Sequence, residues 1–221
     1  RIRAEVASVD GDRAQLLPFA QLHGVGVGDE LRIIASTSTI PCGASLLGRV
    51  VDPFGAPLDG APLPDGLVEW PVERPAPPPL ERRDIDAQLV TGIRVLDGCL
   101  ALGKGQRIGL FAGPGEGKST LLGTLARRAS CDVAVVCLVG ERGREVREFI
   151  DRAVGSSGLS RTVVVVAAAD APPIVRVKAL PAATAIAEWF RAEGKDVLLL
   201  VDSLTRAARA RRDMASALGE P

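Results

Sequence analysis

Nine consecutive residues combine the small, cationic and hydroxyl side chains that a bound phosphate chain requires. They are Ala112, Gly113, Pro114, Gly115, Glu116, Gly117, Lys118, Ser119 and Thr120. Glycines allow consecutive backbone N–H groups to curl around a phosphate, the lysine can reach the β and γ oxygens, and the serine hydroxyl can ligate magnesium. An apolar strand pattern precedes this stretch and a helical pattern follows it. The sequence therefore predicts a nucleotide-binding loop over residues 113–120, which takes ATP together with Mg²⁺.

Two positions depart from the usual form of such a loop. Ala112 stands where the motif normally begins with glycine, and Glu116 places a carboxylate close to the expected phosphates. We expect the Glu116 side chain to point to solvent, because it would otherwise repel a triphosphate. The alternative interpretation is a glycine-rich turn from strand to helix that contains Gly-Lys-Ser by coincidence.

Asp202 ends an apolar run over 197–201 that predicts a buried strand. Open α/β sheets bind their ligands beyond the C-terminal ends of the strands. A carboxylate at that place can hold the water shell of Mg²⁺, so Ser119 and Asp202 form the predicted metal site. The alternative is that Asp202 only caps the helix expected to begin near Leu204, and the two roles are compatible.

Glu141 follows the predicted strand over 133–139 and so emerges at the same edge of the sheet. A carboxylate there can orient or deprotonate the attacking water of a hydrolysis reaction. The charged residues around it, from Arg142 to Glu148, also fit a solvated helix start with surface ion pairs. The spacing alone leaves the catalytic and the surface interpretations open.

The elements that must position these residues alternate between strand and helix from about residue 80. Strands are predicted at 107–112, 133–139, 162–168 and 197–201, and helices at 118–129, 144–154, about 179–193 and about 204–218. Pro172, Pro173 and Pro181 interrupt the segment before the third helix. The alternation predicts an α/β fold of the P-loop NTPase (RecA-like) type, a parallel sheet with helices on both faces.

Residues 1–70 have a different character, with short alternating patterns at 2–9, 13–19, 31–35 and 46–51 separated by glycine-rich turns. We predict a small N-terminal β-barrel there. Five of the nine residues over 71–79 are proline, which stiffens the backbone into an extended connector over 71–80. The remaining residues, 81–221, are predicted to be the N-terminal part of the ATPase domain.

The composition excludes several functions. Lys plus Arg equal Asp plus Glu at 27 each, so no net field draws the protein to nucleic acid or to an anionic membrane. The four cysteines lack the spacing of a zinc site or a disulfide framework, and we interpret them as reduced. His23 has no matched nucleophile, which excludes a Ser-His-Asp hydrolase. No signal peptide or membrane-spanning run is visible, so we expect a cytoplasmic protein.

Several stretches together resemble the ATPases of type III secretion systems. They lie at 91–94, 105–112, 140–149, 199–206 and 219–221, so the match runs nearly end to end, although Ala207 stands where an aromatic residue is usual. That family is similar to flagellar export ATPases and to the catalytic subunits of rotary ATP synthases. Because the chain opens on Arg1 and stops at Pro221, we expect a fragment truncated at both ends, without the arginine finger and base-stacking residue that the resemblance implies further on.

The resemblance implies a homohexameric ring that hydrolyses ATP and energises protein export. Glu141 then polarises the attacking water, and Lys118 and Arg142 face the phosphates as cations. Implied partners are stalk and stator proteins, an export gate and chaperone–substrate complexes, at the cytoplasmic face of the inner membrane and without nucleic acid. Related non-catalytic ring subunits carry glutamine in place of Glu141, which favours an active subunit.

Three further interpretations stay open at this point: a flagellar export ATPase, a Rho-like RNA-translocating hexamer, and a non-catalytic nucleotide-binding ring subunit. The RNA-translocating type should expose aromatic residues on a basic face, whereas residues 1–70 hold only Phe19, Phe54 and Trp70. The cluster of Arg206, Arg209, Arg211 and Arg212 is interpreted as a solvated or inter-subunit face.

Overall fold

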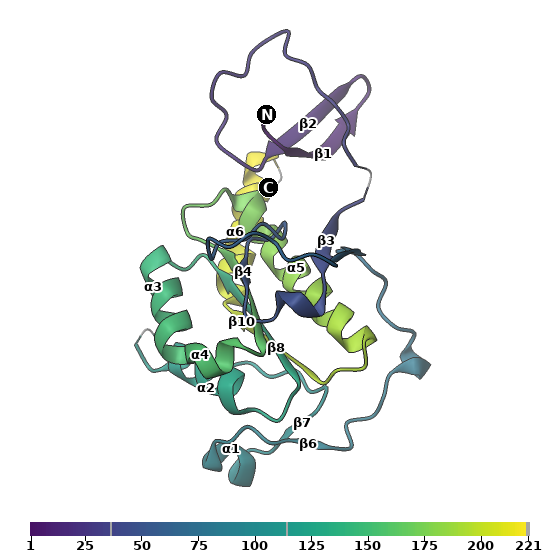
Figure 1. Ribbon diagram of the computed structural model, residues 1–221. Coiled ribbons are helices and arrows are strands. Elements are labelled where there is room, and N and C mark those ends of the chain that lie inside the picture. The colour runs from purple at the N-terminus through teal and green to yellow at the C-terminus, as the bar shows by residue number, and fades with distance from the viewer. Residues whose placement is uncertain (36, 114, 220–221) are drawn as a thin grey trace.

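A parallel four-stranded sheet in the order β10-β8-β9-β4 forms the centre of the molecule. The structure is a computed structural model that describes residues 1–35, 37–113 and 115–219 (Figure 1). The strands are β4 (Val50–Val51), β8 (Val133–Val139), β9 (Thr162–Ala167) and β10 (Val197–Asp202). Every residue of β8 and β9 is buried, as their continuous apolar sequences require of strands covered on both faces. The predicted strands over 133–139, 162–168 and 197–201 are confirmed to within one residue.

Helices cover both faces of this sheet, as the alternating pattern predicts. Figure 1 shows α2 (Lys118–Arg128), α3 (Gly143–Glu148) and α4 (Gly155–Leu159) on one side of β8, with α5 (Pro173–Ala192) on the other. The π-helix η3 (Phe149–Val154) joins α3 to α4, and α6 (Leu204–Ala217) packs beside α5. Alternate residues of β8 divide between the faces: Val135 and Cys137 pack toward α5, while Ala134 and Val136 pack toward α2.

The helix α5 begins at Pro173, several residues before the predicted start near 179. Pro173 occupies the first turn, where the missing N–H costs nothing. Pro181 lies inside the helix, where it leaves the carbonyl of Val177 without its usual donor. The packing explains why the helix continues through it, because alanines from Ala179 to Ala187 are buried against the sheet.

The predicted strand over 107–112 is wrong for the described chain, which has no strand there. A strand needs a hydrogen-bonded neighbour, and β10, the edge strand of the sheet, pairs only with β8 among the described residues. Ile108 and Leu110 are therefore exposed, and Phe111 is 98% exposed. The chain before this segment forms the short pair of β6 (Gln88–Leu89) and β7 (Leu102–Gly103), with α1 (Arg94–Cys99) between them.

The strands of the N-terminal region do not close into the predicted barrel within the described residues. β1 (Ala4–Asp10) pairs with β2 (Arg13–Pro18) in a hairpin, β3 (Thr39–Cys42) pairs with β5 (Val68–Pro71), and 31–35 forms no strand. β4 joins the central sheet in parallel with β9. Both residues of β4 are apolar and buried, which suits a strand covered on both faces better than a barrel wall. The packing thus crosses the boundary predicted at 71–80.

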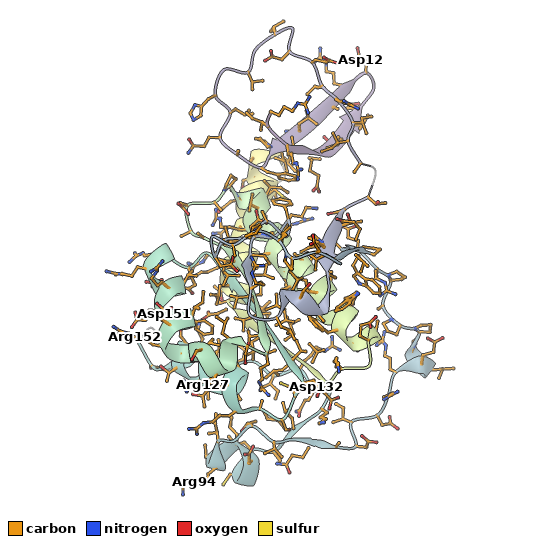
Figure 2. All side chains as sticks on the ribbon, viewed as in Figure 1. Asp12, Arg94, Arg127, Asp132, Asp151 and Arg152 are labelled. Atoms are coloured by element: carbon orange, nitrogen blue, oxygen red, sulfur yellow. The ribbon has the colours of Figure 1, made fainter. Side chains whose placement is uncertain are left out.

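Charged side chains of both signs lie around the outside of the molecule. Figure 2 shows Asp12 at the hairpin tip, Arg94 on α1, and Asp151 beside Arg152 on η3. The hairpin is tied to the body by an ion pair between Glu5 and Lys178 of α5 at 2.6 Å. None of the helices in the described chain has the length and apolar character needed to cross a bilayer.

The packing of α2 on η3 generates a stability prediction at Gly123. A Cβ at this position would lie 2.4 Å from the Cβ of Ala153, so Gly123→Ala forces the two helices apart. We expect a net loss of about 1–3 kcal/mol in the free energy of unfolding, measured by urea denaturation. Gly98→Ala in α1 is the matched control, because a Cβ there meets no described atom within 4 Å and alanine raises helix propensity. Equal stability of the two variants would contradict the close packing of α2.

Candidate nucleotide-binding site

The loop before α2 has the backbone conformation that a phosphate cradle needs. Gly115 and Gly117 lie at φ +81° and +83°, in the left-handed region that a side chain would strain. Gly117 is the N-cap of α2 and offers no side chain to the first helical N–H groups, which stay open to an anion. A cavity of about 430 Å³ lies between this helix start and 109–112. Ser119 and Thr120 lie in the first turn of α2 and are exposed. Pro114, also predicted to bind nucleotide, lies outside the described residues.

Glu116 is exposed, as expected, and its carboxylate also contacts the loop's own backbone. The Gly113 N–H donates a hydrogen bond of 2.9 Å to Glu116 Oε2. A carboxylate acceptor stabilises a loop N–H group that would otherwise have no hydrogen-bond partner. One of the loop's own acidic side chains thus serves as an anion for a loop N–H group.

Asp202 lies at the C-terminal end of β10 and is 2% exposed. The ammonium of Lys118 lies 2.6 Å from Asp202 Oδ1, and Ser119 Oγ donates to Oδ2 at 3.5 Å. The ion pair explains how a carboxylate can be buried at this edge of the sheet, because an unpaired buried charge is costly. The alternative role of Asp202 as a helix cap is wrong, since Ser203 is the N-cap of α6 and accepts the Arg206 N–H.

The residues around Asp202 suit a magnesium ion. Asp202 Oδ1 is buried and has no hydrogen-bond partner within the described chain, and the Lys118 ammonium lies beside it as an ion-pair partner. The described residues contain no cluster of three or more acidic, His or Cys ligands for a metal. Mg²⁺ does not need one, since it is usually held by one or two carboxylates with waters and substrate phosphates. Asp202 and Ser119 fit that kind of site.

Glu141 follows β8 at the same edge, and the backbone of Gly140 and Glu141 is anchored to the end of β9 and the chain just after it. The Gly140 N–H donates to Ala167 O at 2.7 Å, and the Ala169 N–H donates to Glu141 O at 3.0 Å. The Glu141 side chain is 14% exposed, and its Oε1 lies 2.7 Å from Arg206 Nη1. Burial raises the pKa of Glu141, the Glu145 carboxyl beside it raises the pKa further, and Arg206 lowers it.

Arg206 belongs to the site, although the sequence pattern grouped it with the other arginines of α6 on a solvated or inter-subunit face. The structure places Arg206 in the first turn of that helix, where it contacts Glu141 and Gly140. The available signal was its position four residues after Asp202, at the start of a helix that leaves the site. Arg142 is exposed at the start of α3, and its N–H donates to Glu145 Oε2 at 3.3 Å. Its role toward phosphate stays a prediction.

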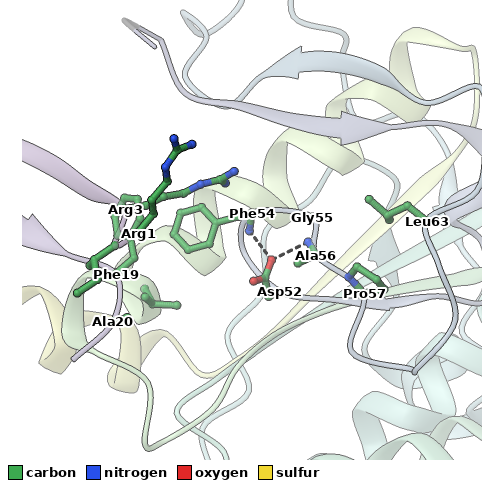
Figure 3. A pocket seen from close by; sticks show the side chains of 12 residues that line it. Arg1, Arg3, Phe19, Ala20, Asp52, Phe54, Gly55, Ala56, Pro57 and Leu63 are labelled. Atoms are coloured by element: carbon green, nitrogen blue, oxygen red, sulfur yellow. Dashed lines mark hydrogen bonds between the residues drawn. The ribbon is translucent and has the colours of Figure 1, made fainter. Parts of the chain in front are cut away.

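A second hollow of about 480 Å³ lies elsewhere, between the hairpin and the turn after β4 (Figure 3). Figure 3 shows Arg1 and Arg3 on one side of it and Phe54 and Asp52 on the other. Asp52 accepts the N–H groups of Phe54 and Ala56, both at 2.8 Å. Its carboxylate is thus used by the turn, and none of the described residues of the phosphate loop lines this hollow.

Comparisons with known proteins agree with the resemblance drawn from the motifs. Residues 92–221 match the ATP synthase alpha/beta family, nucleotide-binding domain. The chain is 44% identical over 220 residues to the Flagellum-specific ATP synthase of Bacillus subtilis, with 100% of the chain and 50% of that relative covered. It is 49% identical over 225 residues to the Type 3 secretion system ATPase of Xanthomonas euvesicatoria, with 99% of the chain and 50% of that relative covered.

A solved structure gives the same result for the fold. The assembled ATPase EscN from the type III secretion system of enteropathogenic E. coli is similar at a TM-score of 0.92 and 45% identity. The similarity covers 100% of this chain and 54% of that one. The chain spans about half the length of the curated relatives it matches.

The geometry around Asp202 predicts opposite effects of Asp202→Asn with and without metal. With EDTA, the affinity for nucleotide should stay equal or rise. Lys118 would then bind the phosphate without first having to break its ion pair with the Asp202 carboxylate. With Mg²⁺, the concentration needed for half-maximal enhancement of binding should rise about tenfold or more. Titration of a fluorescent nucleotide at increasing Mg²⁺ measures both. Asp196→Asn, just before the other end of β10, is the control, and an unchanged Mg²⁺ requirement in Asp202→Asn would exclude this carboxylate from the metal site.

Proposed function

Since this chain belongs to the ATP synthase alpha/beta family, we propose that it binds ATP with Mg²⁺ and that the protein hydrolyses ATP to ADP and phosphate. One observation carries the proposal: Lys118 and Ser119 at the start of α2 meet the buried Asp202 at the end of β10. The sequence left open the alternative of a glycine-rich turn that binds no ligand. Such a turn would not require a buried acid beside the loop lysine.

Each residue of the site has a separate role in hydrolysis. Lys118 leaves Asp202 to bind the phosphate chain, and the open N–H groups of the loop and of α2 bind its oxygens. Asp202 and Ser119 would hold the magnesium ion, which when bound neutralises charge on the β and γ phosphates. Glu141 orients the attacking water and accepts charge from it. The raised pKa of Glu141 makes it a better proton acceptor than an exposed glutamate, provided it is ionised.

We further propose that the protein works as a homohexameric ring that energises protein export by a type III secretion system. The proposal is supported by the 49% identity to the Xanthomonas ATPase and by the similarity to EscN. One EscN structure is of the assembled ATPase, and another is of the assembled ATPase in complex with its central stalk EscO. The stator, the export gate, chaperone–substrate complexes and a location at the cytoplasmic face of the inner membrane belong to the same proposal. Flagellar relatives, at 44% to 47% identity, are equally close, so flagellar export is the second candidate.

Two structural features argue against an RNA-translocating hexamer and against a non-catalytic ring subunit. Phe19 and Phe54 stack on each other with ring centroids 4.5 Å apart, and Trp70 packs under Arg74, so these rings are engaged within the chain rather than presented to RNA bases. A non-catalytic subunit has no need of Glu141 held at the phosphate edge. Complementation of a strain that lacks the secretion ATPase, and separately of one that lacks the flagellar ATPase, distinguishes the two export systems.

The first functional prediction concerns the loop lysine. Lys118→Ala should weaken ATP binding roughly tenfold or more, because a charge-assisted contact to phosphate is lost. Phosphate release by the assembled protein should fall to background. Fluorescent-nucleotide titration measures the affinity, and Lys195→Ala, an exposed lysine before β10, is the control. Unchanged affinity in Lys118→Ala would contradict the assignment of the loop.

The second prediction separates binding from turnover. Glu141→Gln should keep nucleotide affinity while phosphate release falls about a hundredfold or more, since the amide has the same shape but cannot accept a proton. Glu148→Gln, an exposed position on the neighbouring helix α3, is the control. If Glu141→Gln lost nucleotide binding together with turnover, Glu141 would have a structural role instead.

A further inference from the structure

The carboxylate of Glu116 lies against the phosphate loop, on the wall of the cavity beside it. Its Oε2 accepts the Gly113 N–H at 2.9 Å, and a Cβ built on Gly113 would lie 3.0 Å from Oε1. Glu116 and Lys118 are the only charged residues among the described ones that line this cavity of about 430 Å³. A polyphosphate bound by the loop would therefore lie close to a carboxylate.

The charge of the loop lysine is already balanced by a different acid. Lys118 Nζ lies 2.6 Å from Asp202 Oδ1, and Ser119 Oγ donates to Asp202 Oδ2 at 3.5 Å. Glu116 takes part in none of the ion pairs of the described chain. The loop and its ion-pair partner thus place one cation against two carboxylates, and only Asp202 is positioned with Ser119 to hold a metal.

We propose that Glu116 is a specificity-determining residue, which makes the site select nucleotide in complex with Mg²⁺ over metal-free nucleotide. This inference rests on the proposed function, because it assumes that the loop binds ATP with Mg²⁺. A carboxylate repels the charge of a neighbouring polyphosphate. Mg²⁺ neutralises charge on the β and γ phosphates, so the repulsion is weaker for the metal complex. The selectivity comes from an unfavourable contact with the wrong ligand.

The hydrogen bond to Gly113 makes this repulsion effective. An unrestrained glutamate on the surface could turn away from a bound anion, and solvent would screen its charge. The contact with the Gly113 N–H instead holds the Glu116 carboxylate on the segment that curls around the phosphates. It also occupies an N–H group that could otherwise bind a phosphate oxygen. Occupation of the N–H weakens binding with and without metal alike, whereas repulsion discriminates between the two.

The test compares nucleotide binding with and without metal in Glu116→Gln. Glutamine removes the charge but keeps the shape and an oxygen that can accept the Gly113 N–H. The assembled protein is titrated with a fluorescent ATP analogue at low salt. We expect affinity in EDTA to rise about tenfold, and affinity at saturating Mg²⁺ to rise by no more than about twofold. Glu73→Gln, an exposed position in the connector, is the control and should change neither affinity.

A second variant and a change of salt separate charge from hydrogen bonding. Glu116→Asp keeps the charge on a shorter side chain, so it should keep the preference for the metal complex. The gain in EDTA for Glu116→Gln should shrink at high salt, because the charge of an exposed carboxylate is screened there. Loss of the metal preference in Glu116→Asp, or a gain that does not depend on salt, would contradict a role of the charge.

An equal rise in affinity with EDTA and with Mg²⁺ in Glu116→Gln would overturn the proposal, because Glu116 would then only occupy a loop N–H group. Unchanged or lower affinity in EDTA would overturn it as well. Failure of the proposed function has a different signature. Binding without phosphate release by the unchanged protein would refute hydrolysis while the metal preference is still measured, and no nucleotide binding at all would refute both.

Discussion

The parallel register of β8 and β10 determines where the acidic residues of the site lie. Asp202 pairs with Leu138, so Glu141 extends three residues beyond that pair on the neighbouring strand. Because parallel strands end at the same edge of a sheet, both carboxylates come to the edge at which α2 begins. Alternation along β10 then places Asp202 on the same face as Leu200, the face that α2 covers. The contact with Lys118 follows from this register.

Two buried or half-buried acids at one edge require compensation, and the chain supplies a cation for each. Lys118 pairs with Asp202, and Arg206 pairs with Glu141. A buried carboxylate without a partner would be protonated or would destabilise the fold. The two cations are held differently: Lys118 lies in the first turn of α2, whereas Arg206 lies at the start of α6 and its backbone N–H is bound by Ser203.

The cradle itself depends on local geometry more than on the sheet. Residues 107–112 form no strand, yet the turn at Gly115 and Gly117 and the uncapped start of α2 are present. Glycines at positive φ and a helix N-terminus suffice to align N–H groups toward an anion. The carboxylate of Glu116 on the Gly113 N–H shows the same preference of the loop for negative charge.

The sequence by itself determined most of the helices and strands of the central sheet and which residues are candidates for the site. Continuous apolar runs predicted β8, β9 and β10, because only strands buried on both faces carry them, and the glycine–lysine–serine pattern located the loop. It could not determine which strands pair: 107–112 has strand character but no neighbour among the described residues, and β4 belongs to the central sheet rather than to a barrel. Pairing depends on contacts between distant residues, which local pattern does not encode. For the same reason only the tertiary structure joined Arg206 to Glu141 across 65 positions and showed that Asp202 is buried with Lys118 while Ser203 caps α6.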